Sequence, residues 1–412
     1  MSVTPARFPA ALPPSVAQHW RALIAEFGSP LAAYDLETVR RQCRALKRAF
    51  SFCDPFFSVK ANHNPALLQA ILAEGFGVDA VSPNEAALAL RCGAAPDQVI
   101  YVENNMTDAE MAWAAEKGVR LAIGSLSRLG KYARAYPRSK VGIRINADVG
   151  GAHHARTFTA GPDSKFGIHF TQAEAALDFA AQHGVKITLL QQHIGSGWLE
   201  ESSFREAVEI LLREAQKFPD LDIIDFGGGF GVPYRAGDKQ LSLEEMAQWL
   251  RKRLDLFEAE QGRAYAYAIE PGRYIVAECG VLLATVQDKK SGSDGREFLG
   301  LDTGFNHLMR PALYGSVHEI VNLSRPDAPP KPYDICGNIC ESTDFFARGR
   351  EIPEAQEGDV LAILHYGAYG AAMSNAYNLR PPAPEVLIDG DKFTLTRERA
   401  SLDTLMAGYK LP

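Results

Sequence analysis

The chain has 412 residues, of which 46% are hydrophobic and 23% are charged, and its formal net charge is −7. This composition is that of an ordinary globular protein, and the mild acidity argues against non-specific binding to nucleic acid or to an anionic membrane surface. No apolar run approaches the roughly 20 residues that a membrane-spanning helix needs. Six scattered cysteines and the lack of a secretory-signal pattern lead us to expect a reduced, cytoplasmic protein.

From about residue 55 to residue 275, short β-rich runs alternate with amphipathic helical stretches. The helical stretches, such as 64–75 and 107–118, begin near Asn, Ser or Thr and end at Gly, as helix capping predicts. Strand–helix alternation predicts a parallel sheet covered by helices, and eight such units fit a (β/α)₈ barrel in an α/β fold. An open doubly wound sheet is the alternative. The eight β-rich runs are 55–61, 77–82, 99–104, 119–124, 140–146, 187–195, 221–229 and 265–272.

After about residue 280 the pattern changes to short β-like runs separated by Gly, Pro and Asp turns, which predicts a second, all-β domain at the C-terminus. The early run 30–36 is also β-like and is a candidate to pair with that domain. We therefore expect a barrel domain over 34–275 and a β-sheet domain over 1–33 plus 276–412. The C-terminal runs are 281–288, 296–302, 333–337, 359–364, 385–390 and 392–397.

The carboxyl ends of the predicted barrel strands carry polar residues, and that rim is where such barrels hold catalytic groups. Taken singly, each residue has an ordinary explanation: a solvated lysine, a structural histidine, a tight glycine turn, a paired carboxylate. The glycine turn does not match G-x-G-x-x-G, so a dinucleotide site is not indicated. No His, Cys or acidic cluster has a recognised ligand spacing, so no metal is expected. The residues at these ends are Lys60, Asp79, His193, Gly227–Gly229, Glu270 and Arg273.

Taken together, these residue types suit pyridoxal 5'-phosphate. That cofactor needs a lysine for its Schiff base, N–H donors for its phosphate and an acid beside its pyridine nitrogen. Lys60, the glycine turn and Glu270 would supply them, and Ser196 adds a hydroxyl donor. On this hypothesis Lys60 lies in an apolar strand, where desolvation makes its amine less basic and more nucleophilic.

Several longer motifs extend over nearly the whole chain, from about residue 30 to residue 408. They are "FSVKAN", "HIGSG", "DFGGGFGVPY", "EPGRYIV", "RPALYGSVHEI", "CESTDFFA" and "GAYGAAMSNAYNLRP". Together they resemble the barrel-type pyridoxal-phosphate decarboxylases, which include diaminopimelate, ornithine and arginine decarboxylases, and within that family they look most like the diaminopimelate enzymes. The resemblance implies the alanine-racemase-like fold type III and a carboxy-lyase that converts meso-2,6-diaminopimelate to L-lysine.

The resemblance also implies roles for residues around the cofactor. Lys60 resembles the Schiff-base lysine, His193 the histidine that stacks on the cofactor ring, and Asp79 an aspartate near the lysine amine. Glu270 resembles the partner of the pyridine nitrogen. The implied phosphate cradle consists of Ser196, Gly228, Gly229 and the turn formed by Glu270, Pro271, Gly272 and Arg273.

Further roles implied by the resemblance concern the substrate. Cys340 resembles the proton donor, Glu341 the acceptor for a substrate amine, and Tyr369 an aromatic residue that contacts both cofactor and substrate. In this family Cys340 and Glu341 reach the active site of a partner subunit, so a homodimer is implied. The distal carboxylate would be held by Arg273, Arg310 and Tyr314, and two arginines with a tyrosine also suit a planar carboxylate on physical grounds.

Some positions near the substrate depart from the family pattern, and they leave the substrate open. The alternative is a decarboxylase of the same fold that acts on another carboxylated amino acid or conjugate, such as a siderophore or antibiotic intermediate. A non-catalytic homologue is disfavoured by the intact Lys60 and Cys340, and a racemase by Glu270. A lid is expected near 150–165. The departing positions are His63, 80–85, Gly197–Trp198, Gly315, Thr343 and His365–Tyr366.

Overall fold

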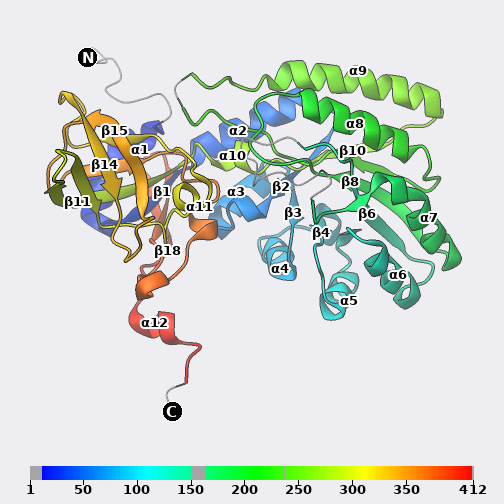
Figure 1. Ribbon diagram of the computed structural model, residues 1–412. Helices are drawn as coiled ribbons and strands as arrows, with labels where there is room; N and C mark the ends of the chain where they lie inside the picture. Colours follow the sequence, from blue (N-terminus) through cyan, green and yellow to red (C-terminus); the bar gives the residue numbers. More distant parts are fainter. Residues whose placement is uncertain (1–11, 151–160, 162–163, 236, 411–412) are drawn as a thin grey trace. The chain divides into compact units, whose positions relative to one another are not determined.

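The computed structural model describes residues 12–150, 161, 164–235 and 237–410 (Figure 1). Most of the expected lid segment therefore lies outside the described residues. The chain divides into a barrel unit, Arg41–Val232 with Lys239–Tyr274, and a sheet unit, Met1–Arg40 with Pro233–Asp238 and Ile275–Pro412. The expected domain limits at residues 34 and 275 stay a prediction, because compact units are not by themselves independent domains.

The barrel unit contains eight parallel strands that close into a ring in the order β2-β3-β4-β5-β6-β8-β9-β10, with β10 paired to β2. This confirms the predicted (β/α)₈ barrel, and the open-sheet alternative is wrong. A two-residue strand, β7 (Ile168–His169), adds to the edge of β6. The barrel strands are β2 (Asp54–Ser58), β3 (Gly77–Ala80), β4 (Val99–Val102), β5 (Arg120–Ile123), β6 (Lys140–Asn146), β8 (Lys186–Gln192), β9 (Ile223–Asp225) and β10 (Ala266–Ile269).

The helices between these strands surround the barrel (Figure 1), and their limits follow local capping. Ser82 accepts a hydrogen bond from the Glu85 N–H at the start of α4, and Thr107 forms a capping box with Glu110 at the start of α5. Gly118 ends α5 in the left-handed conformation. The helices are α2 (Leu36–Ala49), α3 (Pro65–Ala73), α4 (Pro83–Arg91), α5 (Asp108–Lys117), α6 (Leu126–Ala135), α7 (Ala173–Gln182), α8 (Ser202–Ala215), α9 (Leu243–Gln261) and α10 (Arg273–Val276), with 3₁₀ turns at Val59–Ala61, Pro96–Gln98 and Phe170–Gln172.

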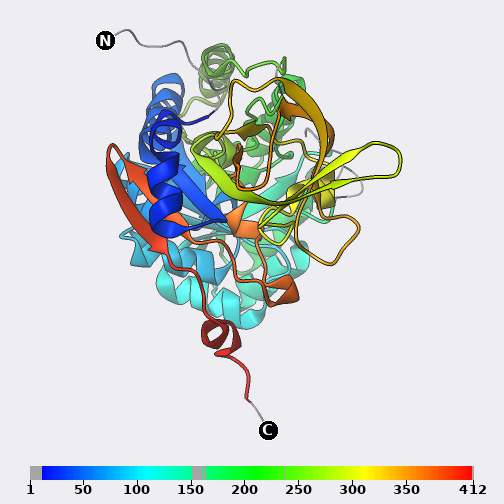
Figure 2. The same cartoon turned by 90° about the vertical axis from the view of Figure 1, so that its left-hand side faces the viewer.

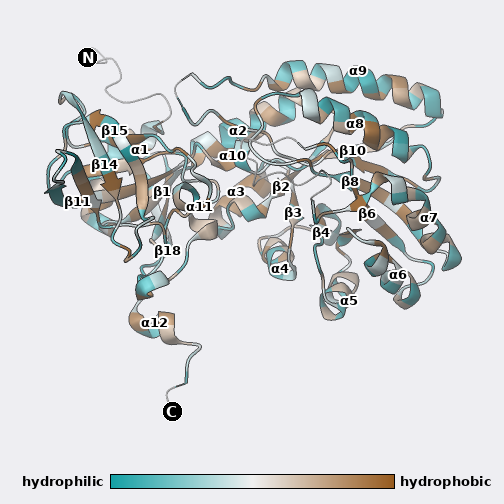
Figure 3. Cartoon of the chain, viewed as in Figure 1, coloured by the Kyte–Doolittle hydropathy of each residue, from teal (hydrophilic) through white to brown (hydrophobic). Residues whose placement is uncertain are grey.

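The barrel interior is apolar over much of its length. One buried cluster joins side chains from five strands, and each fully buried large side chain stabilises the fold by about 1.5–3 kcal/mol. Figure 3 shows the contrast between hydrophobic strands and hydrophilic outer helix faces. Polar side chains therefore meet only where the strands end. The cluster consists of Phe56, Ile100, Val102, Ala122, Leu189 and Ala268.

The sheet unit is built on a mixed sheet in the order β15-β14-β12-β11-β1-β17-β18, with β16 also paired to β11 and β13 paired to β16 (Figure 2). β1 is antiparallel to β11 and parallel to β17, which confirms that the early run pairs with the C-terminal strands. Two strands, β13 and β15, and three helices were not predicted. The strands are β1 (Leu31–Asp35), β11 (Gly280–Ser291), β12 (Glu297–Leu301), β13 (Ile320–Asn322), β14 (Pro330–Cys336), β15 (Phe345–Pro353), β16 (Val360–Ile363), β17 (Glu385–Asp389) and β18 (Lys392–Arg397), and the helices are α1 (Pro14–Phe27), α11 (Arg310–Tyr314) and α12 (Leu402–Met406), with 3₁₀ turns at Ala371–Met373 and Tyr377–Leu379.

Among the residues with described coordinates, no helix has both the length and the apolar character needed to cross a membrane.

Candidate active site

Lys60 lies one turn beyond the carboxyl end of β2. The strand stops at Ser58, and Lys60 sits in the 3₁₀ turn Val59–Ala61, so the prediction of a strand over the whole run 55–61 is wrong at its end. The Lys60 Nζ lies 2.6 Å from Asp79 Oδ2, and its side chain is 29% exposed. The partner of the amine is the buried Asp79 carboxylate, the residue that the resemblance places near it.

Ser58 and Asp79 hold this lysine in place. Asp79, the second-to-last residue of β3, is fully buried, and the Ser58 hydroxyl donates to its Oδ2 at 2.7 Å. The same hydroxyl lies 3.0 Å from the Glu270 carbonyl oxygen, and the Ser58 N–H donates to the Pro271 carbonyl. The ends of β2, β3 and β10 are thus joined by hydrogen bonds around the Lys60 amine.

The glycine turn that follows β9 is a site of close backbone approach. A Cβ on Gly228 would lie 1.8 Å from the Glu270 carbonyl oxygen, and one on Gly229 would lie 2.2 Å from the Gly195 carbonyl oxygen. The Gly197 and Trp198 N–H groups both donate to the Gly229 carbonyl. No residue with a side chain fits at Gly228, because the loops after β8, β9 and β10 meet there.

Two polar side chains lie on the same loops. Arg273, the first residue of α10, donates from Nη2 to the Ser196 hydroxyl at 2.9 Å. His193 follows β8, and its Nδ1 accepts a hydrogen bond from the Gly228 N–H at 3.2 Å. Burial, with smaller contributions from Lys60 and Arg144, lowers the pKa of His193 well below its usual value, so this imidazole is neutral and its Nδ1 accepts.

Glu270 directly follows β10 and is almost completely buried. Its Oε2 accepts from Gln191 Nε2 at 2.8 Å. Burial, and then the nearby carboxyls of Asp225 and Asp79, raise the pKa of Glu270 well above its ordinary value. A group of this kind gains most from a cationic partner, because a positive charge would favour its ionised form.

Sequence analysis missed three buried polar residues of this rim: Gln191, Asp225 and Arg144. Arg144 on β6 is 8% exposed, and its Nη2 lies 3.4 Å from the His193 carbonyl oxygen. Asp225 is fully buried at the end of β9. The signal for Asp225 was available, because it stands two residues before the glycine turn at the end of a predicted strand.

In the sheet unit, Arg310 is buried at the start of α11 among aromatic and imidazole rings. Its Nη1 donates to His318 Nε2 at 2.9 Å, while His318 Nδ1 donates to the Leu364 carbonyl at 2.7 Å. The guanidinium carbon lies 4.8 Å from the centre of the Tyr234 ring, a cation–π distance. These contacts fix the orientation of the guanidinium, and none of them involves a carboxylate.

Cys340 and Glu341 lie on an exposed turn of the sheet unit. The Asn378 side chain donates to Cys340 Sγ at 3.1 Å, and the Tyr377 hydroxyl donates to Glu341 Oε1 at 2.9 Å. The segment after β16 therefore holds both residues at the surface of the unit, where neither is enclosed by its own chain.

The remaining predicted substrate residues, Tyr314 and Tyr369, are half-buried in the sheet unit. Tyr314 ends α11, one turn after Arg310, and Tyr369 has a positive φ of 61° in the turn after β16. The departing residue His365 is buried against Tyr234, with ring centres 4.8 Å apart. Its two ring nitrogens have no hydrogen-bond partner among the described residues.

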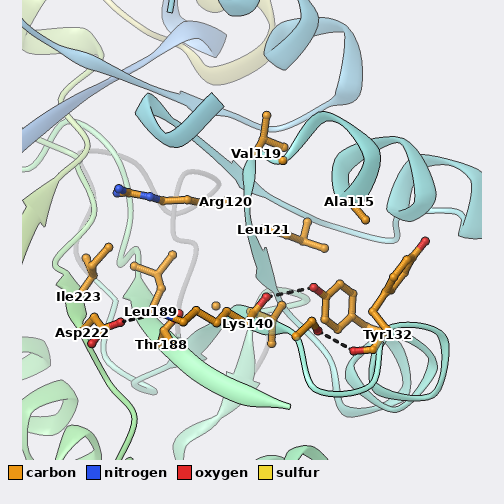
Figure 4. A pocket seen from close by; sticks show the side chains of 15 residues that line it. Ala115, Val119, Arg120, Leu121, Tyr132, Lys140, Thr188, Leu189, Asp222 and Ile223 are labelled. Atoms are coloured by element: carbon orange, nitrogen blue, oxygen red, sulfur yellow. Dashed lines mark hydrogen bonds and ion pairs between the residues drawn. The ribbon is translucent and has the colours of Figure 1, made fainter. Parts of the chain in front are cut away.

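Two cavities are lined by residues other than the predicted cofactor-binding residues of the barrel rim. One of about 500 Å³ lies at the amino ends of β5, β6 and β9, opposite the polar rim, and Figure 4 shows Lys140 and Tyr132 at its wall. The other, of about 490 Å³, lies in the sheet unit between α11 and the segment 342–348. It is lined by Gly315 and Thr343, two of the departing positions.

Comparison with known proteins identifies the family. Residues 36–277 match the family described as pyridoxal-dependent decarboxylase, pyridoxal binding domain. The chain belongs to the pyridoxal-dependent decarboxylase family. A diaminopimelate decarboxylase from Methanothermobacter thermautotrophicus is 40% identical to it over 94% of this chain and 93% of that protein.

Solved structures of diaminopimelate decarboxylases are similar to this chain over nearly its whole length. A crystal structure of a diaminopimelate decarboxylase superposes with a TM-score of 0.90 at 33% identity, over 98% of this chain and 99% of that one. The Helicobacter pylori diaminopimelate decarboxylase, solved in complex with L-lysine, has a TM-score of 0.87 at 28% identity, over 94% and 98% of the two chains.

The barrel rim fits the cofactor that gives the family its name. Lys60 supplies an amine, the turn at Gly228 leaves space beside backbone N–H groups that a Cβ would fill, and Glu270 supplies a buried acid. The Ser196 hydroxyl and the Arg273 guanidinium, already in contact, are the pair of groups expected around a phosphate. These residues would hold pyridoxal phosphate by its aldehyde, ring nitrogen and phosphate.

Proposed function

We propose that this protein is a pyridoxal-phosphate-dependent carboxy-lyase that converts meso-2,6-diaminopimelate to L-lysine. The observation that carries the proposal is the meeting of the Lys60–Asp79 pair, the glycine turn and Glu270 at one end of the barrel. The assignment of meso-2,6-diaminopimelate as the substrate is supported by relatives named diaminopimelate decarboxylase, which match nearly the whole chain.

In this proposal the barrel residues bind and orient the cofactor. When bound, pyridoxal phosphate withdraws electrons from the α-carbon of an attached amino acid and so allows loss of CO₂. Lys60 provides the attacking amine and Asp79 orients it. Glu270 would bind the ring nitrogen as a carboxylate, and the neutral His193 would pack beside the ring. Gly228, Gly229, Ser196 and the 270–273 turn, which includes Pro271, Gly272 and Arg273, hold the phosphate.

The sheet unit supplies the substrate contacts of this proposal. Arg310 binds the distal carboxylate, in an orientation fixed by His318 and Tyr234. Tyr314 of the same unit and Arg273 of the barrel unit complete the group that binds this carboxylate. Tyr369 contacts both cofactor and substrate. Because a guanidinium held in this way matches a planar carboxylate, a substrate with a distal cation would be disfavoured.

We further propose a homodimer in which Cys340 and Glu341 act in the partner's active site, Cys340 Sγ returning a proton after CO₂ is lost and Glu341 accepting a substrate amine. Its support is the exposed turn on which both residues lie. Mixing the inactive variants Lys60→Ala and Cys340→Ala should restore about one quarter of the wild-type activity, because half of the random dimers have one complete site. No restored activity in a mixture shown to exchange subunits would contradict shared sites.

The test of the main proposal is CO₂ release and product identification with meso-diaminopimelate and pyridoxal phosphate. L-Lysine formed in equal amount to CO₂ is the expected result, with Lys60→Ala as the inactive control. A protein that binds the cofactor but yields neither product rules out this substrate. Fractionation of cells should find the protein in the cytoplasm, which also remains a proposal.

A second candidate is decarboxylation of a larger amino acid or conjugate that carries a distal carboxylate. The observation that favours it is His365, whose buried ring nitrogens have no hydrogen-bond partner among the described residues and whose ring contacts the same Tyr234 as Arg310. A panel of carboxylated amino acids of increasing length distinguishes the two candidates by kcat/KM.

A further inference from the structure

Asp225 and Glu270 form a pair of buried carboxyl groups across two adjacent strands. Asp225 ends β9 and lies opposite Ala268 of β10, so Glu270, two residues further along, projects from the same face of the barrel wall. Both side chains are essentially inaccessible to solvent, and this burial, together with the Asp225 carboxyl, raises the pKa of Glu270.

The outer oxygens of this pair are already in use. Asp225 Oδ1 accepts from the Gly227 N–H at 2.9 Å, and Glu270 Oε2 accepts from Gln191 at 2.8 Å. Asp225 Oδ2 and Glu270 Oε1 have no hydrogen-bond partner in the part of the chain that the structure describes. Two adjacent buried carboxyl groups cannot both ionise without a large electrostatic cost, and one proton held between these two oxygens would satisfy both of them.

The charges around the pair do not replace that proton. Lys60 is ion-paired with Asp79, and Arg144 contacts the His193 carbonyl. The cations Lys60 and Arg144 thus face three buried acids, and the neutral His193 adds no charge. Burial accordingly raises the pKa of Asp225 to about 7, with the Asp79 carboxylate acting in the same direction.

We propose that Asp225 is a positioning residue that keeps this proton when the cofactor is bound, so that Glu270 meets the ring nitrogen as a carboxylate and accepts a hydrogen bond from Asp225. This inference rests on the proposed function. The proton is conserved: Asp225 holds it and Glu270 is ionised. Because Asp225 also accepts the Gly227 N–H, one side chain links the glycine turn to the acid beside the ring nitrogen.

The test compares wild-type protein with Asp225→Asn, whose amide can accept from Gly227 and donate to Glu270 but cannot titrate. Asp222→Asn, on the same strand run but exposed, is the matched control. The probe is pyridoxamine 5'-phosphate, which cannot form a Schiff base with Lys60, added to the apoprotein between pH 6 and 9 and followed by fluorescence. Titration of the probe and of other groups is common to all three proteins.

We expect wild-type and Asp222→Asn to lose affinity, relative to Asp225→Asn, by up to about tenfold for each pH unit above the pKa of Asp225 in the free protein, until its pKa in the complex is reached. A constant ratio across this range, or an Asp225→Asn protein that binds more than about tenfold more weakly at pH 6, overturns the inference. If wild-type protein binds neither pyridoxal phosphate nor pyridoxamine phosphate, the proposed function itself fails.

A second measurement needs no variant and so does not depend on the folding of Asp225→Asn. In the infrared spectrum of wild-type protein labelled with ¹³C-aspartate, the complex with pyridoxamine phosphate at pH 6 should retain a protonated carboxyl band that shifts with the label. A complex that retains no such band would show that Asp225 is ionised and would overturn the inference.

Discussion

The two units bury their polar groups in opposite ways. At the barrel rim, three acids are packed against Lys60 and Arg144, and burial raises the pKa of Asp225 and Glu270. In the sheet unit, Arg310 is surrounded by rings, and burial with the Arg310 charge lowers the pKa of His365 to about 4.

The difference makes the two regions respond oppositely to pH. A buried acid with a raised pKa is most favourable at low pH, and its contribution to stability is lost as the pH rises from about 4 to about 7. A buried histidine with a lowered pKa contributes stability above about pH 6.5, which is lost as the pH falls towards 4. The barrel rim is thus suited to hold protons and bind a cation, whereas the sheet unit is suited to stay neutral around one fixed positive charge.

Replacing Lys60 should have the largest effect. Lys60→Ala removes the amine that links the cofactor to the barrel, and kcat/KM should fall on the order of 10⁴-fold because both the nucleophile and a proton-transfer group are lost. The visible absorbance of the lysine-bound cofactor should disappear. Lys140→Ala, at the opposite end of the barrel strands, is the control and should leave kcat/KM and the absorbance unchanged. An absorbance band that survives in Lys60→Ala would show that Lys60 does not bind the cofactor covalently.

Glu270→Gln tests whether the barrel rim needs an ionisable acid. An amide cannot stabilise a protonated ring nitrogen as a carboxylate does, so kcat should fall about 10²–10³-fold. The free energy of unfolding of the apoprotein at pH 8 should not fall, because the amide removes a buried group whose pKa is raised. Steady-state kinetics and denaturant unfolding of the same preparations measure both; a stable variant with unchanged kcat contradicts the assigned role.

Arg310→Lys tests the fixed charge of the sheet unit. The change keeps the charge but removes the planar fork that donates to His318 and stacks on Tyr234. We expect KM to rise about 10–100-fold, as for the loss of one charged hydrogen bond, with kcat changed much less. The exposed Arg348, changed to Lys, is the control. A fall in kcat at constant KM would show that Arg310 does not act through substrate binding.

His365→Asn should have the smallest effect on activity and sharpens the pH comparison. Asparagine tolerates the positive φ of 58° and does not titrate, so the loss of stability between pH 6.5 and 4 should shrink by about 3 kcal/mol. Asp225→Asn should act on the other side and reduce the loss between pH 4 and 7. Unfolding by urea at several pH values measures both, with His183→Asn, at a half-buried position, as the control. Equal dependence of stability on pH in all proteins would contradict the contrast between the units.

Local sequence signals predicted most of the barrel, because each strand and each capped helix is specified within about ten residues. The 3₁₀ turn at Lys60 was missed for a different reason. The run 55–61 has the apolar character of a strand to its end, but β2 stops where Ser58 bonds to Pro271 and Asp79, residues far away in the sequence. The unpredicted strand β15 likewise depends on its pairing with β14, since its own pattern is interrupted by charged residues.

By itself, the sequence determined the order of strands and helices, the pairing partner for the early run 30–36 and the residue types at the strand ends, because capping, periodicity and the glycine turn are local properties. Only the tertiary structure decided which of those ionisable groups lie close enough to interact electrostatically. It joined Lys60 to Asp79, gave Glu270 a second buried acid in Asp225, and surrounded Arg310 with rings. Those partnerships depend on distances of a few ångströms between distant segments, and the state of each proton follows from them.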